Sequence, residues 1–191
     1  MTTILIVDGN PLLWRSVEIY KDLRTKAGKA TGCIYGALEI LFRAVTQVKP
    51  DHIIVTWDVG KSRWRKALHP GYKASREHRD AMPVPFDEVI PQFTDVQQLL
   101  RMAGVPQFGV QGVEADDLIG LLSSGFSSIP AYEGTQVVIL SSDRDLHQLV
   151  RPNVRQFYSV NKRWTDVDSI REDNYGLRPE QLILLKAITG D

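Results

Sequence analysis

The stretch TILIVDGN, residues 3–10, decides the fold of this chain. A run of apolar residues leads into Asp8, and Gly9-Asn10 follows as a turn. An apolar run of this length bounded by turn residues is typical of a strand buried on both faces, as in a parallel sheet. A single aspartate after a strand is more often a turn or helix-capping residue. Asp8 therefore indicates a functional site only in combination with other acidic residues.

Two further strands end in the same way. HIIVTWD (52–58) and TQVVILSSD (135–143) are apolar runs that close on Asp58 and Asp143. Helical patterns separate the strands, which favours an α/β fold with a mainly parallel central sheet and helices on both faces. The four longer helices are expected at 11–26, 31–50, 86–104 and 114–126. Because ligands bind outside the carboxyl ends of parallel strands, three aspartates are expected at one rim.

Shorter elements complete the expected fold, and the whole chain, 1–191, is expected to form one domain. They are a strand at 105–109, a short helix at 144–150, a hairpin at 154–160 and 162–167, and a last helix at 178–189. The polar connection 59–85 is too long for an ordinary loop, and long loops in compact domains are usually functional.

The composition is that of an ordinary soluble protein, but its charges are unevenly placed. Net charge is zero, with 23 basic and 23 acidic residues, which argues against a uniformly basic surface. Seven cations nevertheless fall between residues 61 and 79: Lys61, Arg63, Arg65, Lys66, Lys73, Arg76 and Arg79. No apolar run approaches the roughly 20 residues that cross a membrane, and the N-terminus is not a secretory signal. The single cysteine, Cys33, fits a reducing cytosol.

Acidic residues cluster at two further places. Glu114, Asp116 and Asp117 open a helix, and Asp143 and Asp145 form a D-x-D pattern after a strand. The helix dipole favours acids in a first turn, so a solvated helix start is the plain alternative. Three acids in four residues nevertheless exceed what capping needs, and the chain closes on another acid, Asp191.

Convergence of these carboxylates would require cations. Two unit charges 4 Å apart repel by roughly 4 kcal/mol at an effective dielectric of 20. Oxygen ligands without His or Cys select Mg²⁺ or Mn²⁺ over Zn²⁺. Two such ions about 4 Å apart are a known device for hydrolysing phosphodiesters.

The basic segment 60–80 mixes cations with Trp64 and Tyr72. Lys and Arg bind phosphates, and aromatic rings offer stacking surfaces for unpaired bases. A solvated loop with packed aromatic residues is the alternative, but an acidic metal rim needs a substrate that brings phosphate. The histidines lack the spacing of metal ligands and are interpreted as surface or packing residues: His52, His69, His78 and His147.

Taken together, the motifs resemble the flap endonuclease/5′-nuclease superfamily, which includes bacteriophage 5′–3′ exonucleases and the 5′-nuclease domain of bacterial DNA polymerase I. The motifs occur in family order along nearly the whole chain: ILIVDGNPLLWRS, VTWDVGKSRWRKALHPGYKASR, GVEADDLIG, ILSSDRDLHQLV and ITGD. The resemblance implies a PIN-like 5′-nuclease fold and a structure-selective 5′–3′ exonuclease and flap endonuclease with two Mg²⁺ or Mn²⁺ ions.

The resemblance also implies roles for individual residues. The first ion would be held by Asp8, Asp58, Glu114 and Asp116, and the second by Asp117, Asp143, Asp145 and Asp191, with Asp116 bridging. Lys73 and Arg76 would grip the scissile phosphate and act in catalysis together with Asp8 and Asp116. Tyr72 would stack on the terminal base. Residues 62–95 would form the helical arch, whose Arg63, Arg65, Lys66 and Arg79 would bind substrate.

The implied partners are DNA with free 5′ ends, flaps or nicks, and RNA–DNA primers, handled by a monomer in a bacterial or phage-infected cytoplasm during replication and repair. The family pattern continues beyond Gly190-Asp191 with another Asp and a helix–hairpin–helix that binds duplex DNA through K⁺. Residues 178–191 are therefore expected to start a truncated DNA-binding region, and K⁺ is expected only where that region is present. A catalytically impaired, structure-specific DNA-binding module is the alternative that this departure leaves open.

Two other enzyme classes share the first motif. A receiver domain needs an acid pair after its first strand, whereas Gly9 follows Asp8. A phosphoaspartyl hydrolase needs D-x-D there, and residue 10 is Asn. Neither class explains the E-A-D-D sequence at 114–117.

Overall fold

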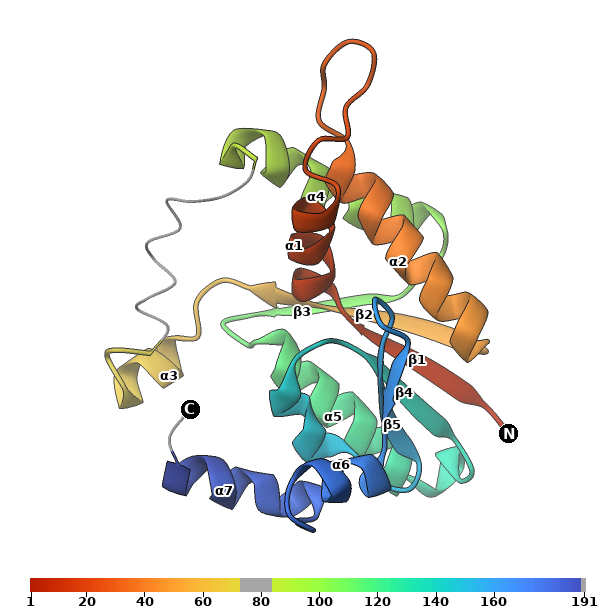
Figure 1. The fold of residues 1–191 in the computed structure, drawn as a ribbon, viewed down its shortest axis with the longest axis vertical. Coiled ribbons are helices and arrows are strands. Elements are labelled where there is room, and N and C mark those ends of the chain that lie inside the picture. The colour runs from red at the N-terminus through yellow and green to blue at the C-terminus, as the bar shows by residue number, and fades with distance from the viewer. Residues whose placement is uncertain (73–83, 190–191) are drawn as a thin grey trace.

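A computed structural model of the protein describes residues 1–72 and 84–189 (Figure 1). Its strands are β1 (Thr3–Asp8), β2 (His52–Val59), β3 (Gln107–Gln111), β4 (Gln136–Leu140), β5 (Val154–Tyr158) and β6 (Arg163–Thr165). Its α-helices are α1 (Gly9–Ile19), α2 (Gly32–Val48), α3 (Arg63–Leu68), α4 (Phe86–Met102), α5 (Ala115–Ser128), α6 (Val167–Asp173) and α7 (Leu182–Thr189). Short 3₁₀ segments are η2 (Pro130–Tyr132), η3 (Arg144–Leu149) and η4 (Pro179–Gln181).

The strands form one sheet in the order β3-β2-β1-β4-β5-β6. All neighbouring pairs are parallel except β5 and β6, which are antiparallel. The chain leaves β1 toward β2 on one side and returns to β4 on the other, so the strand order reverses between β1 and β4. Doubly wound sheets bind their ligands at such a switch point, outside the carboxyl ends of the strands. Asp8 is the last residue of β1 and lies at this place.

Helices cover both faces of the sheet, as expected (Figure 1). Leu5 and Val7 of β1 pack with α1, α2 and α4 in one core cluster. Ile4 and Ile6, the alternate residues, pack with Ile119 of α5 in the other. Successive side chains of a strand point to opposite faces, so a strand covered on both sides must be apolar throughout. This explains the uninterrupted ILIV run that precedes Asp8.

Glycines allow two close approaches near the start of the chain. A Cβ on Gly9 would lie 2.3 Å from the ring of Trp57, which places the start of α1 directly against β2. A Cβ on Gly36 would lie 2.5 Å from the ring of Tyr20 and 2.8 Å from the Cβ of Ser16. No Cβ fits at such distances, so close packing requires glycine at both positions.

Several expected boundaries were wrong. The first helix ends at Ile19 rather than near residue 26, because the chain turns into an exposed loop in which Arg24 bridges to Ala30. The third apolar strand ends at Leu140 rather than at 143. Helix α6 was not expected; it begins where Asp166 caps it, and its start limits β6 to Arg163–Thr165.

Other elements agree with the sequence prediction. The terminal hairpin is present as β5 and β6, and the short helix after β4 is the 3₁₀ segment η3. The long basic connection contains α3, while its residues 73–83 lie outside the described part of the chain.

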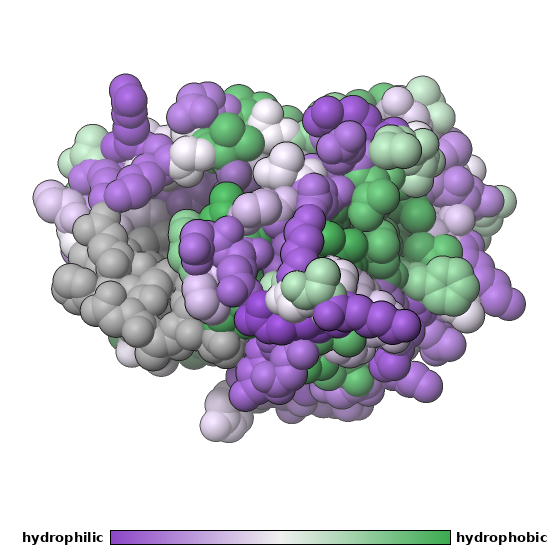
Figure 2. All heavy atoms as spheres, turned by 90° about the horizontal axis from the view of Figure 1, so that it is seen from above, coloured by the Kyte–Doolittle hydropathy of each residue, from purple (hydrophilic) through white to green (hydrophobic). Residues whose placement is uncertain are grey.

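The surface is mainly polar, with hydrophobic side chains gathered in places (Figure 2). One exposed row runs along α2, where Tyr35, Leu38 and Phe42 are 52%, 39% and 73% exposed. Within residues 1–72 and 84–189, no helix is long and apolar enough to cross a membrane.

Candidate active site

Asp8 is the buried centre of the acidic rim, with 2% of its surface exposed. It occupies the N-cap position of α1, yet its side chain makes no capping hydrogen bond. Its Oδ2 instead accepts a hydrogen bond of 2.9 Å from Ser141 Oγ, which follows β4. The carboxylate is therefore directed across the switch point and does not serve as a helix cap.

Three other aspartates surround Asp8 closely enough to act on its charge. Burial first, then repulsion by Asp116, and to a smaller extent repulsion by Asp58 and Asp143, raises the pKa of Asp8 from 3.8 to about 8. The hydrogen bond from Ser141 opposes this shift. We call these four residues, Asp8, Asp58, Asp116 and Asp143, the inner acids. They come from the ends of three neighbouring strands and the first turn of α5, as the sequence predicted.

Hydrogen bonds fix the inner acids that lie on loops and strand ends. Asp58 Oδ1 accepts from the Ala115 backbone N–H at 2.7 Å, which ties β2 to the start of α5. The side-chain oxygen of Asn10 accepts from the Asp58 N–H at 3.0 Å. Asp143 donates its N–H to Ser141 Oγ at 3.1 Å, so this hydroxyl connects two of the acids.

Three other predicted metal ligands lie within the described residues, and each contacts a cation or a tyrosine hydroxyl. We call Glu114, Asp117 and Asp145 the outer acids. Arg65 of α3 forms a bidentate ion pair with Asp117, with distances of 2.8 and 2.7 Å. The same guanidinium lies 3.5 Å from Glu114 Oε2. The Tyr72 hydroxyl donates to that oxygen at 2.9 Å, and Lys186 of α7 pairs with Asp145.

Arg65 and Tyr72 were expected to bind substrate, and the structure brings both onto the acidic rim. The Arg65 guanidinium also lies 4.5 Å from the ring centroid of Trp64 and 5.9 Å from that of Tyr72. Its hydrogen bonds to Asp117 raise its pKa above the ordinary value for arginine. The residues around α3 therefore supply positive charge to the outer acids.

Other expected site residues lie elsewhere or cannot be placed. Arg63 is exposed on α3 and Lys66 is half-buried there. Lys73, Arg76, Arg79 and Asp191 lie outside the described residues, so their expected roles stay predictions.

The rim fits a divalent cation by its chemistry. Its donors are carboxylate oxygens, and besides burial, repulsion by the other three inner acids contributes to the raised pKa of Asp8. Within the described ranges, no three Asp, Glu, His or Cys side chains stand close enough together to hold one ion. Ligation of one ion by three of the inner acids therefore requires their carboxylates to move closer together.

Sequence reasoning missed three residues that organise this rim. Ser141 joins Asp8 to Asp143, and Lys186 pairs with Asp145. Gln156 of β5 is 3% exposed and donates its amide N–H groups to the carbonyl oxygens of Ser141 and Asp143, each at 2.8 Å. A glutamine beside the buried apolar residues Val154 and Phe157 of β5 was the available signal for the last of these.

The fold and rim place the protein in the class of 5′-nuclease folds. The bacteriophage T5 flap endonuclease, solved in a pseudo-enzyme–product complex with DNA and metal ions, superposes with a TM-score of 0.78 and 25% identity. The similarity covers 99% of this chain and 66% of that one. Residues 3–175 match the family described as 5′–3′ exonuclease, N-terminal resolvase-like domain, and the chain belongs to this family.

Curated relatives carry related names. A 5′–3′ exonuclease of Aquifex aeolicus is 31% identical over 191 residues, which cover all of this chain and 62% of that protein. DNA polymerase I of Chloroflexus aurantiacus is 31% identical over 196 residues, covering 98% of this chain and 20% of the polymerase. The chain thus spans about a fifth of the polymerase and under two thirds of the exonuclease. The family resemblance inferred from the motifs is confirmed.

Proposed function

We propose that this chain is the catalytic part of a divalent-metal-dependent, structure-selective 5′-nuclease that acts on DNA as a 5′–3′ exonuclease and flap endonuclease. The observation that carries the proposal is the convergence of the inner acids at the switch point of a 5′-nuclease fold. The phage T5 relative, crystallised with DNA and metal ions, supports both the substrate class and the cofactor class.

The residues proposed to hold the metal are those of the family motifs, and the described ones lie on or near the rim. Asp8, Asp58, Glu114 and Asp116 would ligate a first Mg²⁺ or Mn²⁺, directly or through water. Asp117, Asp143, Asp145 and Asp191 would surround a second. When bound, such ions lower the pKa of an attacking water and stabilise charge on the phosphate and the leaving oxygen.

The protein's own residues would position the acids and the substrate. Ser141 orients Asp8 by donating to one carboxylate oxygen, which leaves the other for a cation. Gln156 holds the loop that carries Asp143. Around α3, Arg63, Arg65 and Lys66 would bind backbone phosphates, together with Arg79, and Lys73 and Arg76 would grip the scissile phosphate. Tyr72 would stack on the terminal base, as part of an arch over residues 62–95.

The proposed partners are DNA with 5′ flaps, nicks or free 5′ ends, and RNA–DNA primers. We propose a monomer that works in the cytoplasm of a bacterium or a phage-infected cell. K⁺ would take part only where a helix–hairpin–helix region follows residues 178–191. A module that only binds DNA is not favoured, because all four inner acids are present.

A gel assay tests the proposal. A 5′-labelled flap, a nicked duplex, a single strand and a blunt duplex are each incubated with the chain in Mn²⁺, in Mg²⁺ and in EDTA. We expect cleavage of the flap and nick in metal, none in EDTA, and loss of cleavage in Asp116→Ala and Asp143→Ala. Asp22→Ala, on the exposed loop after α1, is the matched control and should cut normally.

Two results would contradict the proposal. Full cleavage by both Asp116→Ala and Asp143→Ala would exclude the rim as the catalytic site. Metal-dependent binding of the flap without any cleavage, by the unchanged chain, would favour a DNA-binding module.

A further inference from the structure

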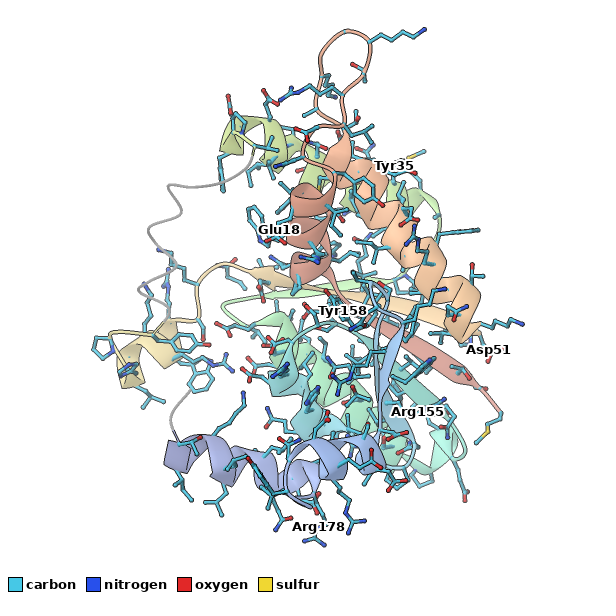
Figure 3. All side chains as sticks on the ribbon, in the orientation of Figure 1. Glu18, Tyr35, Asp51, Arg155, Tyr158 and Arg178 are labelled. Atoms are coloured by element: carbon cyan, nitrogen blue, oxygen red, sulfur yellow. The ribbon has the colours of Figure 1, made fainter. Side chains whose placement is uncertain are left out.

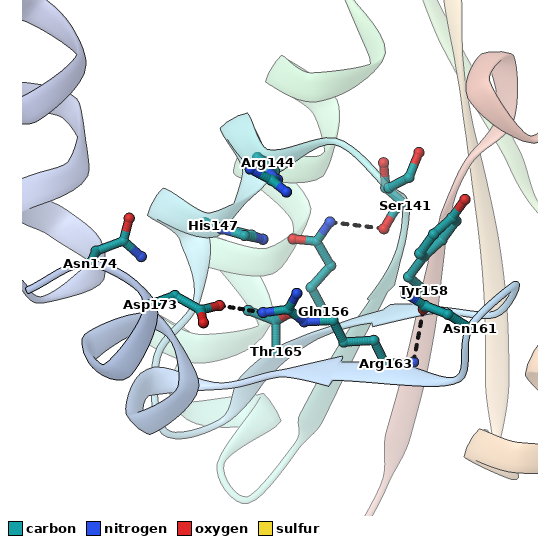
Figure 4. Close-up of a pocket in the computed structure, with 11 residues that line it drawn as sticks. Ser141, Arg144, His147, Gln156, Tyr158, Asn161, Arg163, Thr165, Asp173 and Asn174 are labelled. Carbon is teal, nitrogen blue, oxygen red and sulfur yellow. Dashed lines mark hydrogen bonds and ion pairs between the residues drawn. The ribbon is translucent and has the colours of Figure 1, made fainter. Parts of the chain in front are cut away.

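A polar pocket adjoins the acidic rim on the side of β5 and β6 (Figure 4). Its volume is about 450 Å³, within the roughly 300–1,000 Å³ range of small-molecule sites. Ser141, Ser142 and Tyr158 line it and also line a smaller pocket that contains Asp8. The two spaces therefore share a wall, and these three residues separate the larger pocket from the one that contains Asp8.

The Gln156 side chain has a hydrogen-bond acceptor without a partner among the described residues. Its amide N–H groups are used by two backbone carbonyls, which fixes the orientation of the amide. Its Oε1 is buried and has no hydrogen-bond partner among the described residues. In Figure 4 this oxygen points toward His147, which also lines the pocket. A buried acceptor without a partner is unfavourable, so a ligand group that reaches this oxygen and donates a hydrogen bond to it would be stabilised.

The other walls suit a flat ring joined to an anion. Tyr158 is half-buried and offers an aromatic surface close to α1 (Figure 3). Arg144 and Arg163 supply positive charge, and Arg163 is already paired with Asp173, so Arg144 is the cation that we assign to an incoming anion. Aromatic stacking and hydrogen bonds to base edges are how proteins commonly hold unpaired bases.

We propose that this pocket is a nucleotide-binding subsite, in which Gln156 Oε1 accepts a hydrogen bond from the base, Tyr158 stacks on it, and Arg144 contacts the phosphate. The inference deepens the proposed nuclease function and rests on it for the link to nucleic acid. Every common base carries an N–H donor, so the subsite would accept all four. The nucleotide is either one residue of a bound strand or a free nucleoside monophosphate.

The test measures binding in EDTA, where no cleavage occurs. The ¹⁵N-labelled chain is titrated with dAMP, dGMP, dCMP and dTMP, and with deoxyribose 5-phosphate and inorganic phosphate as base-free probes. We expect saturable shifts of the Gln156 side-chain amide and of the Tyr158 backbone amide with the nucleotides only. Nucleotide binding is measured without metal, so a failure to bind does not contradict the nuclease proposal. Conversely, loss of cleavage in Asp116→Ala and Asp143→Ala does not test the subsite.

Matched variants separate the contributions of ring and charge. Tyr158→Leu should weaken binding by about tenfold or more, whereas Tyr158→Phe keeps the ring and should bind like the unchanged chain. Arg144→Gln should weaken binding by about tenfold, and Arg101→Gln, at the exposed end of α4, should not change it. Arg144 is exposed, so its variant is expected to fold even if Tyr158→Leu does not.

A competition experiment distinguishes a nucleotide of a bound strand from a free nucleotide. A short 5′-phosphorylated oligonucleotide that displaces dAMP, with the same dependence on Tyr158, identifies a strand subsite; failure to displace it identifies a site for free nucleotides. The proposal is overturned if no nucleotide shifts Gln156, if inorganic phosphate alone reproduces the shifts, or if Arg144→Gln and Tyr158→Leu both bind normally.

Discussion

Arg65 holds Asp117 by both arms of its guanidinium, with nitrogen–oxygen distances of 2.8 and 2.7 Å. The pair joins the short helix α3 to the first turn of α5 across 52 residues of sequence. Its side chains are 21% and 35% exposed, so solvent screens it only in part. A cation from the protein thus neutralises an acid that we assign to the metal rim.

Removing this cation should destabilise the metal-free protein. We expect Arg65→Gln to lower the free energy of unfolding in EDTA by about 1 kcal/mol, after allowance for partial exposure, because Glu114 and Asp117 lose their shared counter-charge. In Mn²⁺ the loss should shrink, since the bound cation takes over the neutralisation. Urea unfolding in both buffers measures this. Arg63→Gln on the same helix is the control, and an equal loss with and without metal would contradict the explanation.

The stability of the metal-free protein should fall as pH rises toward 8. The folded-state pKa of Asp8 is about 8, above its ordinary value of 3.8. The folded protein therefore has its full stability from this group below pH 3.8, where the carboxyl is protonated in both states, and loses it as the pH rises through 8. Within this window one such group costs about 1.4 kcal/mol per pH unit. Urea unfolding in EDTA between pH 5 and 8 should show this slope, and Asp8→Asn should flatten it. An unchanged slope in Asp8→Asn would refute this assignment.

Ser141 should act by positioning the acids. Ser141→Ala removes the hydroxyl that donates to Asp8 and accepts from the Asp143 N–H. Loss of such an outer contact typically costs about 10–100-fold in metal affinity or activity. We expect the Mn²⁺ concentration for half-maximal flap cleavage to rise by about tenfold, with partial recovery of rate at high Mn²⁺. Ser127→Ala on α5 is the matched control; an unchanged metal requirement in Ser141→Ala would show that the hydroxyl is dispensable.

Asp166 should matter for stability alone. Its Oδ1 accepts from the Ser169 N–H at 2.9 Å at the start of α6, and this backbone hydrogen bond is the main cause of its lowered pKa. Asp166→Ala should cost about 1 kcal/mol in unfolding free energy at pH 7, as for other N-caps, and leave cleavage unchanged. Asp166→Asn retains an acceptor and should restore most of the loss. Loss of cleavage in a folded Asp166→Ala would contradict a purely structural role.

Strand ends were the most predictable part of this molecule. Buried parallel strands leave continuous apolar runs, so Asp8 and Asp58 could be placed at a common edge from sequence alone. Asp143 was assigned to that edge correctly, although its strand stops three residues earlier, at Leu140. The strand is shorter than predicted because the Gln156 side chain donates to the carbonyl oxygens of Ser141 and Asp143. In a longer β4, these oxygens would have been available to the backbone of β5.

Contacts between distant side chains could not be predicted. The hydrogen bond between Ser141 and Asp8 spans 133 residues, and the pair of Lys186 with Asp145 depends on where α7 docks. Neither leaves a periodic pattern in the sequence. The end of α1 was missed for a related reason, since the residues after Ile19 are individually compatible with a helix and turn away only in the folded chain.

The neighbours of β1 become available at very different times during synthesis. β2 begins at His52, but β4, with Ser141 after it, begins only at Gln136. Contacts of such long sequence separation form late, because the loop between them must close first. A nascent chain therefore carries Asp8 in a half-built sheet, open to water and without its hydroxyl partner. The acidic rim is completed by the same event that closes the sheet, so the proposed metal site forms only together with the folded state.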